Sequence, residues 1–386
     1  MTAASPYGAK KQGDCAFVAH ANVRLESQLQ SEAFMKLETL LPLGKVDPGL
    51  REPGTPFDIH RVVDDARLVE SLGYDNLMFE ETKHDPYIVM GLAAQATTTL
   101  GIGTAVAIAF PRSPTVTAMS AWTLQKLSRG RFTLGLGTQV RGHIERRYGM
   151  HWSAPGPWMR EYVQAVRAVW AGWQRGEQPC FEGRHYKINL SVPLFDPGPI
   201  EHPDIPIHLA AVNAYMCQVA GEVADGVRPH PVCTPHYIRE VMWPAVRAGA
   251  ARSGRSLDGF AVSIKPLIAT APDAESLAER VRDVRARVAF YASTPAYRAA
   301  FAAHGLGDLA DELKHLSRAQ RWEEMPRYIS DEVLHEYACV GTYDDIAELL
   351  ARRYGGLVSN VEFSIPVRNA QDADILRAML ARLRAA

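Results

Sequence analysis

The chain has 386 residues, of which 47% are hydrophobic, 22% charged and 9% aromatic. These values are typical of a folded, enzyme-sized protein and exclude a disordered tail, a collagen-like repeat and a disulfide-stapled miniprotein. Lys and Arg number 42 against 43 Asp and Glu, and the net charge of -1 provides no overall field that would attract nucleic acid or an anionic membrane.

Cysteine usage and hydropathy indicate a reducing compartment. The five cysteines are widely spaced and include no Cys-x-x-Cys pair, which argues against a disulfide framework and against a zinc site. No stretch reaches the ~18 to 20 continuous apolar residues that cross a bilayer, and the N-terminus does not have the pattern of a signal peptide. We therefore expect a cytoplasmic protein without a membrane anchor.

Residues 1–34 have no sustained period and predict an N-terminal extension. From residue 35 to residue 386, short β-rich runs alternate with segments of helical period, which is the pattern of βαβ units. Eight strands are predicted, over Lys36–Leu41, Asn76–Phe79, Leu100–Ile108, Arg131–Gly135, Ile207–Ala210, Gly226–Pro229, Ala261–Ile268 and Val361–Ile365. Helices are predicted over 58–72, 114–127, 159–173, 214–223, 234–253, 274–290 and 344–354.

Eight strands interleaved with helices favour an α/β fold, a (β/α)8 TIM-type barrel, although an open doubly wound sheet has the same local pattern. Two insertions, at about 174–206 and 292–340, break the alternation, and the first carries six prolines. Long insertions in a barrel commonly form lids or pocket walls, and the alternative is an inert surface loop.

Charged side chains gather directly after the second predicted strand, in residues 80–86 (Glu-Glu-Thr-Lys-His-Asp-Pro). At the carboxyl end of a barrel strand such a cluster is typical of an active-site loop, which makes Glu81 and His84 the candidate functional residues. The alternative is a solvated loop. Asp85 before Pro86 is a residue pair that commonly starts a helix.

Other strand ends carry small and polar residues. Residues 103–105 are small, which suits either a flat ligand or a narrow barrel waist. The loop after the fourth strand offers a hydroxyl, an amide and a cation to a cofactor. The helix that starts near residue 214 has free N–H groups, which form a possible phosphate pocket. Neither Gly101-x-Gly103 nor Gly135-x-Gly137 has the third glycine of a dinucleotide fingerprint.

Four segments together resemble the luciferase-like monooxygenase superfamily. They are residues 73–81, residues 101–104 with the following Arg-Ser-Pro at 112–114, residues 127–137 (Leu-Ser-Arg-Gly-Arg-Phe-Thr-Leu-Gly-Leu-Gly) and residues 220–226. The third segment is the most specific, and the resemblance runs from about residue 35 to the C-terminus. Within the superfamily the chain looks most like the branch that uses the deazaflavin coenzyme F420, with FMN as the alternative cofactor.

The resemblance implies a TIM-type barrel whose carboxyl-end loops hold a tricyclic ring over a non-proline cis peptide, which falls here at Ala105-Val106. It further implies ring-edge contacts from Thr138 and Gln139. The phosphate and ribityl loop of the family matches Ala210, Ala211, Val212 and Asn213.

The chain departs from the family pattern at three places. Glu81-Thr82-Lys83 stands where FMN members commonly have Glu-His-His, Val140 stands where sugar-phosphate dehydrogenases have an acidic residue, and Val212-Asn213 replaces a glycine pair. Glucose 6-phosphate is therefore not the expected substrate.

The resemblance implies an F420-dependent oxidoreductase that moves a hydride between deazaflavin C5 and an apolar organic substrate with a carbonyl or activated alkene. His84 is the predicted acid/base, because histidine titrates at about pH 6.5, and Glu81 would hold the imidazole or the cofactor edge. The alternatives are an FMN-dependent monooxygenase and a non-catalytic flavin-binding barrel. We also expect a homodimer and an F420 or flavin reductase as the source of reduced cofactor.

Overall fold

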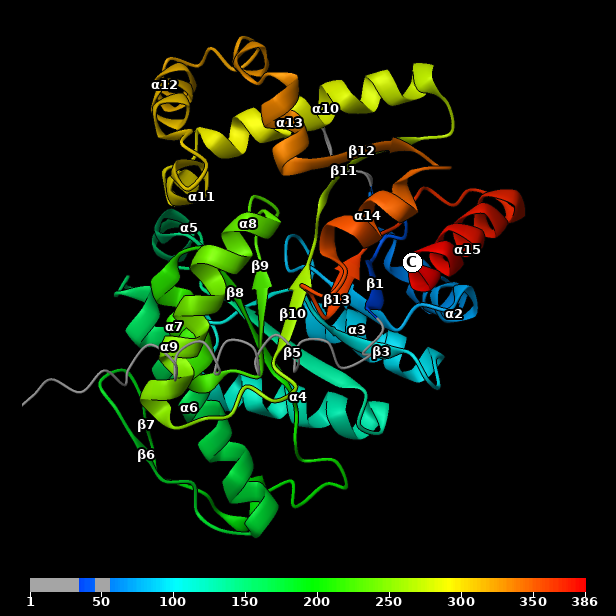
Figure 1. Cartoon of the computed structure of the whole chain (residues 1–386). Coiled ribbons are helices and arrows are strands. Elements are labelled where there is room, and N and C mark those ends of the chain that lie inside the picture. The colour runs from blue at the N-terminus through cyan, green and yellow to red at the C-terminus, as the bar shows by residue number, and fades with distance from the viewer. Residues whose placement is uncertain (1–34, 46–55) are drawn as a thin grey trace, which may run out of the picture. The chain divides into compact units, whose positions relative to one another are not determined.

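The computed structural model describes residues 35–45 and 56–386, in which eight parallel strands close into a barrel (Figure 1). In order around the barrel the strands are β1 (Lys36–Leu40), β2 (Asn76–Phe79), β3 (Gly101–Thr104), β5 (Phe132–Gly137), β8 (Ile207–Ala211), β9 (Gly226–Pro229), β10 (Ala261–Ile264) and β13 (Asn360–Glu362). Pairing of β3 with β5 and of β1 with β13 closes the circle. The predicted (β/α)8 barrel is confirmed and the open sheet is excluded. The predicted extension, 1–34, lies outside the described residues.

Two predicted strands are each divided in the structure. The third is split into β3 and β4 (Ala107–Ile108), which both pair with β5. The seventh stops at Lys265-Pro266, where proline has no N–H for the ladder, and continues as β11 (Leu267–Ala271). β11 leaves the barrel and pairs in parallel with β12 (Ala338–Thr342). The last barrel strand ends at Glu362 rather than at the predicted Ile365.

Helices cover the outside of the barrel. They are α2 (Val62–Leu72), α3 (Pro86–Ala96), α4 (Pro114–Ser128), α5 (Arg141–Arg146), α6 (Pro155–Arg175), α7 (Ala214–Val223), α9 (Trp243–Ser253), α14 (Ile346–Tyr354) and α15 (Ala370–Ala385). A further helix, α10 (Ala274–Ala292), belongs to the cap described below. The predicted helix 234–253 is divided into α8 (Pro235–Tyr237), a π-helical turn (Ile238–Met242) and α9. α3, α5 and α15 add to the predicted helices.

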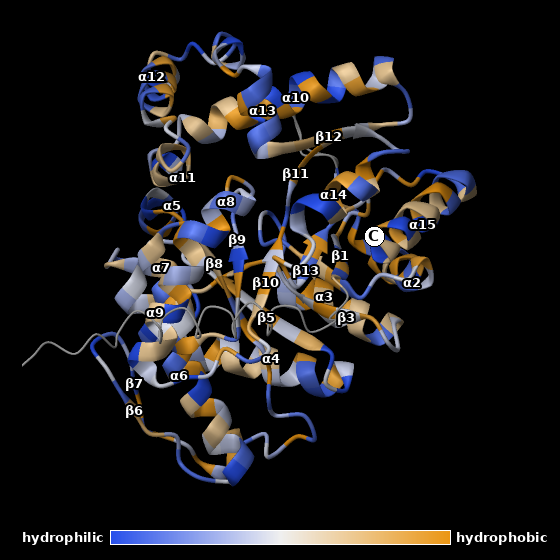
Figure 2. Cartoon of the chain, viewed as in Figure 1, coloured by the Kyte–Doolittle hydropathy of each residue, from blue (hydrophilic) through white to orange (hydrophobic). Residues whose placement is uncertain are grey.

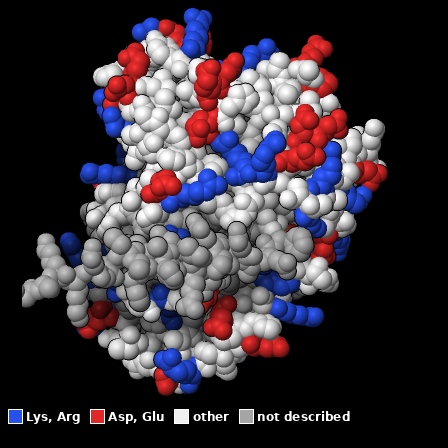
Figure 3. Space-filling view, in the orientation of Figure 1, with Lys and Arg blue, Asp and Glu red and all other residues white. Residues whose placement is uncertain are grey.

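Hydrophobic residues lie mainly between the helices and the strands (Figure 2). α6 shows the pattern clearly, because its buried positions include Tyr162, Val166 and Trp170, which recur every four residues. The barrel interior is more polar: Glu38, Arg228 and Asn360 are buried inside it. The apolar core therefore fixes the barrel from outside and leaves polar side chains within it. On the face seen in Figure 3, the described charges of both signs are interspersed.

The second insertion belongs to a structure that we call the cap, residues 267–342. It comprises β11, α10, α11 (Arg298–Ala302), α12 (Gly307–Arg318), α13 (Asp331–Tyr337) and β12, and it lies over the carboxyl ends of β9 and β10 (Figure 1). The Tyr297 ring stacks on His230 with centroids 4.0 Å apart, and His304 Nε2 lies 2.8 Å from Thr234 Oγ1. His230 and Thr234 follow β9, so the cap packs on the barrel mouth.

The first insertion, 174–206, joins the end of α6 to the start of β8, and so begins and ends at the amino end of the barrel. It holds a hairpin of β6 (Phe181–Glu182) and β7 (Lys187–Ile188), whose tip donates backbone hydrogen bonds from His185 and Tyr186 to Glu161. None of its residues lines the mouth cavity described below.

Candidate active site

The wall of the barrel mouth at β3 and β4 is interrupted by a cis peptide between Ala105 and Val106, at the position that the sequence predicts. Neighbouring strands hold both residues, because Ala105 N donates to Phe79 O (2.9 Å) and Glu81 N donates to Val106 O (3.3 Å). Thr104 Oγ1 donates to Gly135 O (2.7 Å) and accepts from Gly135 N (2.9 Å). The backbone is therefore fixed on both sides of the interruption.

Gly135 and Gly137 in β5 leave the room that this wall needs. A Cβ on Gly135 would lie 1.9 Å from Thr104 O, and one on Gly137 would lie 2.6 Å from Val106 Cγ2. Ala210 is a second small neighbour of Gly137, because the Ala210 Cβ lies 3.7 Å from the position that a Cβ on Gly137 would occupy. The Gly-x-Gly motif is thus a packing requirement of the wall, and Val106, Gly137 and Ala210 form a small, uncharged surface that we call the ring wall.

Glu81 is held in an ion-pair cluster next to the ring wall. Its carboxylate accepts from Ile108 N (2.7 Å) and from Arg112 Nη1 (2.8 and 2.9 Å). Arg112 Nη2 also donates to Asp85 (2.9 Å), whose other oxygen accepts from Tyr87 N (2.9 Å) at the start of α3. The predicted capping role of Asp85 is confirmed, and Glu81 ties β4 to this loop.

His84 lies in the same loop and is half-buried. Its ring packs on Phe57 with centroids 5.0 Å apart and planes inclined by 55°. Arg147 supports the loop by donating to Thr82 O (2.8 Å). The structure places His84 two residues beyond the position of the usual family histidine, and its role as acid/base stays a prediction.

Thr138 and Gln139 follow β5 and are half-buried. Gln139 has a left-handed backbone, with φ of 56°, and its Oε1 accepts from Val140 N (2.9 Å). Thr138 Oγ1 donates to Gln139 O (3.1 Å). Both residues therefore lie at the edge of the ring wall, where the resemblance expects ring-edge contacts.

The loop after β8 is built by Ala210, Ala211, Val212 and Asn213. Asn213 caps α7, because its Oδ1 accepts from Met216 N (2.9 Å), and Tyr237 donates to Val212 O (3.0 Å). Ala211 is buried and Asn213 is exposed. The structure thus brings Ala210 to the ring wall and places Asn213 at the helix start.

A second group of charged side chains lies across the mouth, at the carboxyl ends of β1, β2, β10 and β13. Glu80 accepts from Lys45 Nζ (2.7 Å) and from Lys265 Nζ (3.0 Å). The same Lys265 Nζ lies 3.8 Å from Glu362 Oε1. We call these four residues the charged wall. In the closed strand order β1, β10 and β13 lie opposite β8, β3 and β5, which carry the ring wall, whereas β2 lies next to β3.

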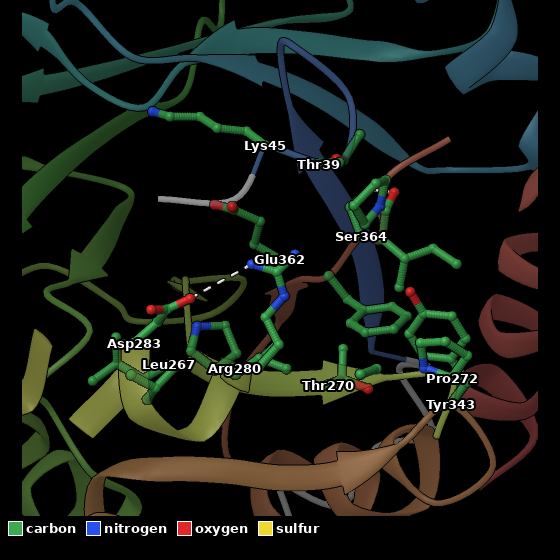
Figure 4. Close-up of a pocket in the computed structure, with 18 of the residues that line it drawn as sticks. Thr39, Lys45, Leu267, Thr270, Pro272, Arg280, Asp283, Tyr343, Glu362 and Ser364 are labelled. Carbon is green, nitrogen blue, oxygen red and sulfur yellow. Dashed lines mark hydrogen bonds and ion pairs between the residues drawn. The ribbon is translucent and has the colours of Figure 1, made fainter. Parts of the chain in front are cut away.

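A cavity of about 430 Å³ opens beside the charged wall (Figure 4). It lies between α10, β11 and the carboxyl ends of β1 and β13. Arg280 and Glu362 extend into it, and Leu267 and Phe363 supply apolar surface. Thr270 Oγ1, also at the cavity, is buried without a hydrogen-bond partner among the described residues. The cavity therefore offers charged, hydroxyl and apolar contacts to one ligand.

The two carboxyls of the charged wall differ in their acidity. Burial raises the pKa of Glu80, but Lys265 and Lys45 outweigh this effect and hold it at about 2. Burial raises the pKa of Glu362 to about 7, and Lys265 offsets only part of that shift. Glu80 is thus a permanent anion, whereas Glu362 gains and loses its proton near neutral pH.

Below the mouth, buried polar groups line the barrel interior. Arg228 pairs with Glu38, which also accepts from Asn360 Nδ2 (3.4 Å). Arg228 Nη1 and Ser263 Oγ have no partner among the described residues. Buried donors of this kind are normally paired, so these atoms are available to a bound ligand or to water.

Sequence analysis did not single out Lys45, Lys265, Glu80 or Glu362 individually. The available signal was the charge itself: Lys265 and Glu362 interrupt apolar runs inside two predicted barrel strands. Among residues 35–45 and 56–386, no group of three His, Cys, Asp or Glu could hold a metal ion, and no helix is long and apolar enough to span a membrane. Cys217, Cys233 and Cys339 are buried, and Cys180 is exposed.

Comparisons with known proteins agree with this architecture. A family described as luciferase-like monooxygenase matches residues 35–360. An uncharacterized protein of Mycobacterium tuberculosis is 42% identical over 329 residues, which cover 85% of this chain and 96% of that protein. An F420-dependent glucose-6-phosphate dehydrogenase of Nocardia farcinica is 28% identical over 62% of this chain and 74% of that enzyme.

A solved structure shares the fold. The coenzyme F420 dependent tetrahydromethanopterin reductase of Methanopyrus kandleri superimposes with a TM-score of 0.68 at 18% identity, covering 90% of this chain and 98% of that chain. The family match spans the barrel from β1 to the start of β13. The chain therefore belongs to the luciferase-like monooxygenase family.

Proposed function

We propose that this protein is an F420-dependent oxidoreductase that transfers a hydride between deazaflavin C5 and an organic substrate with a carbonyl or activated alkene. The observation that carries the proposal is the pair of facing walls in the barrel mouth. Hydride transfer needs a flat surface for the ring on one side and groups that can hold a substrate and move a proton on the other. The ring wall and the charged wall offer these two surfaces.

The residues of the ring wall suit a flat tricyclic ring. Val106, Gly137 and Ala210 present short side chains and backbone, and Thr138 and Gln139 offer polar groups at the edge. Arg228 Nη1 and Ser263 Oγ are buried donors without a partner in the part of the chain that the structure describes, and they would donate to a ring carbonyl. When bound, the deazaflavin supplies or accepts the hydride.

The protein's own groups orient the substrate and exclude water. The cap packs over the mouth through Tyr297 and His304. Leu267 and Phe363 would contact the apolar part of a substrate, and polar groups of the same cavity would hold its carbonyl. Arg112 and Glu81 hold the loop beside the ring wall in place.

The family name itself favours a second candidate, an FMN-dependent monooxygenase that draws on a partner reductase. A non-catalytic flavin-binding barrel is the third. The three differ in cofactor and in turnover, so binding and activity measurements separate them.

The test is a titration of the purified protein with F420 and with FMN, in which fluorescence reports binding. We expect F420 to bind with micromolar or better affinity and FMN at least about tenfold more weakly, a difference of about 1.4 kcal/mol. Exchanging Ala210 for Phe should weaken F420 binding, whereas Ala299→Phe, at an exposed position of α11, should not. Tighter FMN binding with oxygen uptake would favour the monooxygenase, and binding without turnover would favour the non-catalytic barrel.

A further inference from the structure

We propose that the Glu362 carboxyl is the group that exchanges a proton with the substrate, in place of His84. This inference rests on the proposed hydride-transfer function. Glu362 ends β13, lines the mouth cavity and extends into it (Figure 4). Its side chain is 15% exposed, so it is sheltered from bulk water but open to a ligand in the cavity.

The two acidic groups directly after β2, Glu80 and Glu81, are already engaged. Both oxygens of Glu81 accept from Arg112, and one also accepts from Ile108 N. Glu80 accepts from two lysines at 2.7 and 3.0 Å. Among the described residues, the ion pair given for Glu362 is with the more distant Lys265, at 3.8 Å. A carboxyl without a close cation can carry a proton, whereas one between two ammonium groups cannot.

Charged groups from four elements surround Glu362 and set its acidity. Lys265, after β10, favours the anion, and so does Arg228 from β9. Glu80 after β2 and Glu38 in β1 favour the protonated form. Burial is the strongest influence, and it raises the pKa of Glu362 to about 7.

Four further cations line the same cavity: Arg287 on α10, Arg368 before α15, Lys45 after β1 and Arg280 on α10. Lys45 pairs with Glu80, and Arg280 Nη1 lies 3.6 Å from Asp283 on its own helix. Lys45 and Arg280 therefore each have a carboxylate other than Glu362 as a partner. The resulting balance leaves Glu362 able to act as an acid or as a base near neutral pH.

In the reducing direction the substrate's carbonyl carbon accepts a hydride, and the C=O π pair moves to the oxygen, which takes the Glu362 proton. A C–H and an O–H bond form, while the C–H bond of the hydride donor, the carbonyl π bond and the Glu362 O–H bond break. The reduced cofactor supplies both electrons, and the Glu362 carboxylate remains beside Lys265. Oxidation of an alcohol runs the same steps in reverse, with the carboxylate as the base.

The experiment combines a direct titration with kinetics. In protein labelled with ¹³C at glutamate carboxyls, we expect one NMR signal with a midpoint near pH 7, absent from Glu362→Gln and present in Glu348→Gln, an exposed control on α14. Glu362→Gln should lower kcat by roughly 10²-fold or more and leave the F420 Kd within about threefold. Glu362→Asp should retain the pH-dependent limb of the kcat/KM profile.

The inference is overturned if no carboxyl titrates above about pH 6, or if Glu362→Gln keeps wild-type kcat. It is also overturned if His84→Ala removes the pH-dependent limb and Glu362→Gln does not. A wild-type protein that binds F420 but turns over no carbonyl, alkene or alcohol overturns the proposed function, and the inference falls with it. A neutral-pH carboxyl signal together with loss of kcat in Glu362→Gln supports both.

Discussion

Lys265 lies near two carboxyls, those of Glu80 and Glu362, and the pKa of the first is lowered whereas that of the second is raised. Lys265 lies 3.0 Å from Glu80 and 3.8 Å from Glu362, and only Glu80 has a second ammonium group, that of Lys45. The carboxyl with two cations has a pKa of about 2 and the other a pKa of about 7. Their charges at neutral pH are therefore set by neighbours that lie far apart in the sequence.

The raised pKa of Glu362 predicts a pH-dependent stability. The unfolded carboxyl, with a pKa of 4.5, loses its proton before the folded one, at about 7. Stability is therefore lost as pH rises from 4.5 to 7, by about 3 kcal/mol at most. We expect Glu362→Gln to be more stable than the wild type in urea unfolding at pH 8, and the difference to shrink towards zero at pH 4. An equal difference at both pH values would contradict this assignment of the pKa.

Local sequence signals predicted the structural roles of several single residues. Asp85 before Pro86 was expected to cap a helix, and it caps α3. Gly73 was expected to end a helix, and it ends α2 with φ of 86°. The charged wall could not be predicted in the same way, because Glu80 and Lys265 are 185 positions apart and meet only when the barrel closes.

At the scale of elements, close packing against β3 and β4 restricts which side chains β5 can carry. A Cβ on Gly135 would meet the Thr104 carbonyl at 1.9 Å, and backbone cannot move aside as a flexible side chain can. We expect Gly135→Ala to destabilise the protein by about 1 to 3 kcal/mol, the usual cost of overpacking, and to weaken cofactor binding. Urea unfolding and the F420 titration measure both effects.

Gly91 provides the matched control, because it lies in α3 and a Cβ there would make only an ordinary 3.8 Å contact with Leu124. Gly91→Ala should be neutral or stabilise by about 0.5 to 1 kcal/mol, since alanine is the better helix former. Equal destabilisation by both substitutions would show that the Gly135 contact is not the cause.

The order of strands and helices was predicted well because the hydrophobic period of a strand differs from that of a helix. The breaks inside strands were harder. Pro266 was a visible signal that the run Ala261–Ile268 could not stay in one ladder, yet only the pairing of β11 with β12 shows where the second half goes. The resemblance predicted the cis peptide at Ala105-Val106, but the third strand was predicted undivided over Leu100–Ile108, and its division into β3 and β4 was missed.

At the scale of the molecule, α3 and α4 present apolar side chains outward. Ile88 and Met119 are 63% and 55% exposed, and Leu92 and Val116 lie on the same two helices. Exposed apolar groups on adjacent helices are typical of a subunit contact. We expect this face to form the predicted homodimer interface.

Analytical ultracentrifugation tests the prediction. Ile88→Lys combined with Met119→Lys should convert the dimer to a monomer. Leu194→Lys should leave it unchanged, because Leu194 is 85% exposed but belongs to the first insertion and not to α3 or α4. A wild-type monomer, or a dimer that resists the double substitution, would contradict the assignment.

Lys265 and Pro266, the two residues between β10 and β11, join the barrel to the cap. Pro266 has a restricted backbone, and Lys265 is tethered electrostatically to Glu80 and Glu362. A ligand that gains or loses negative charge next to Lys265 changes the force on this short joint, from which about 75 residues of cap extend. A change of charge at the mouth beside Lys265 therefore acts directly at the joint between the barrel and the cap.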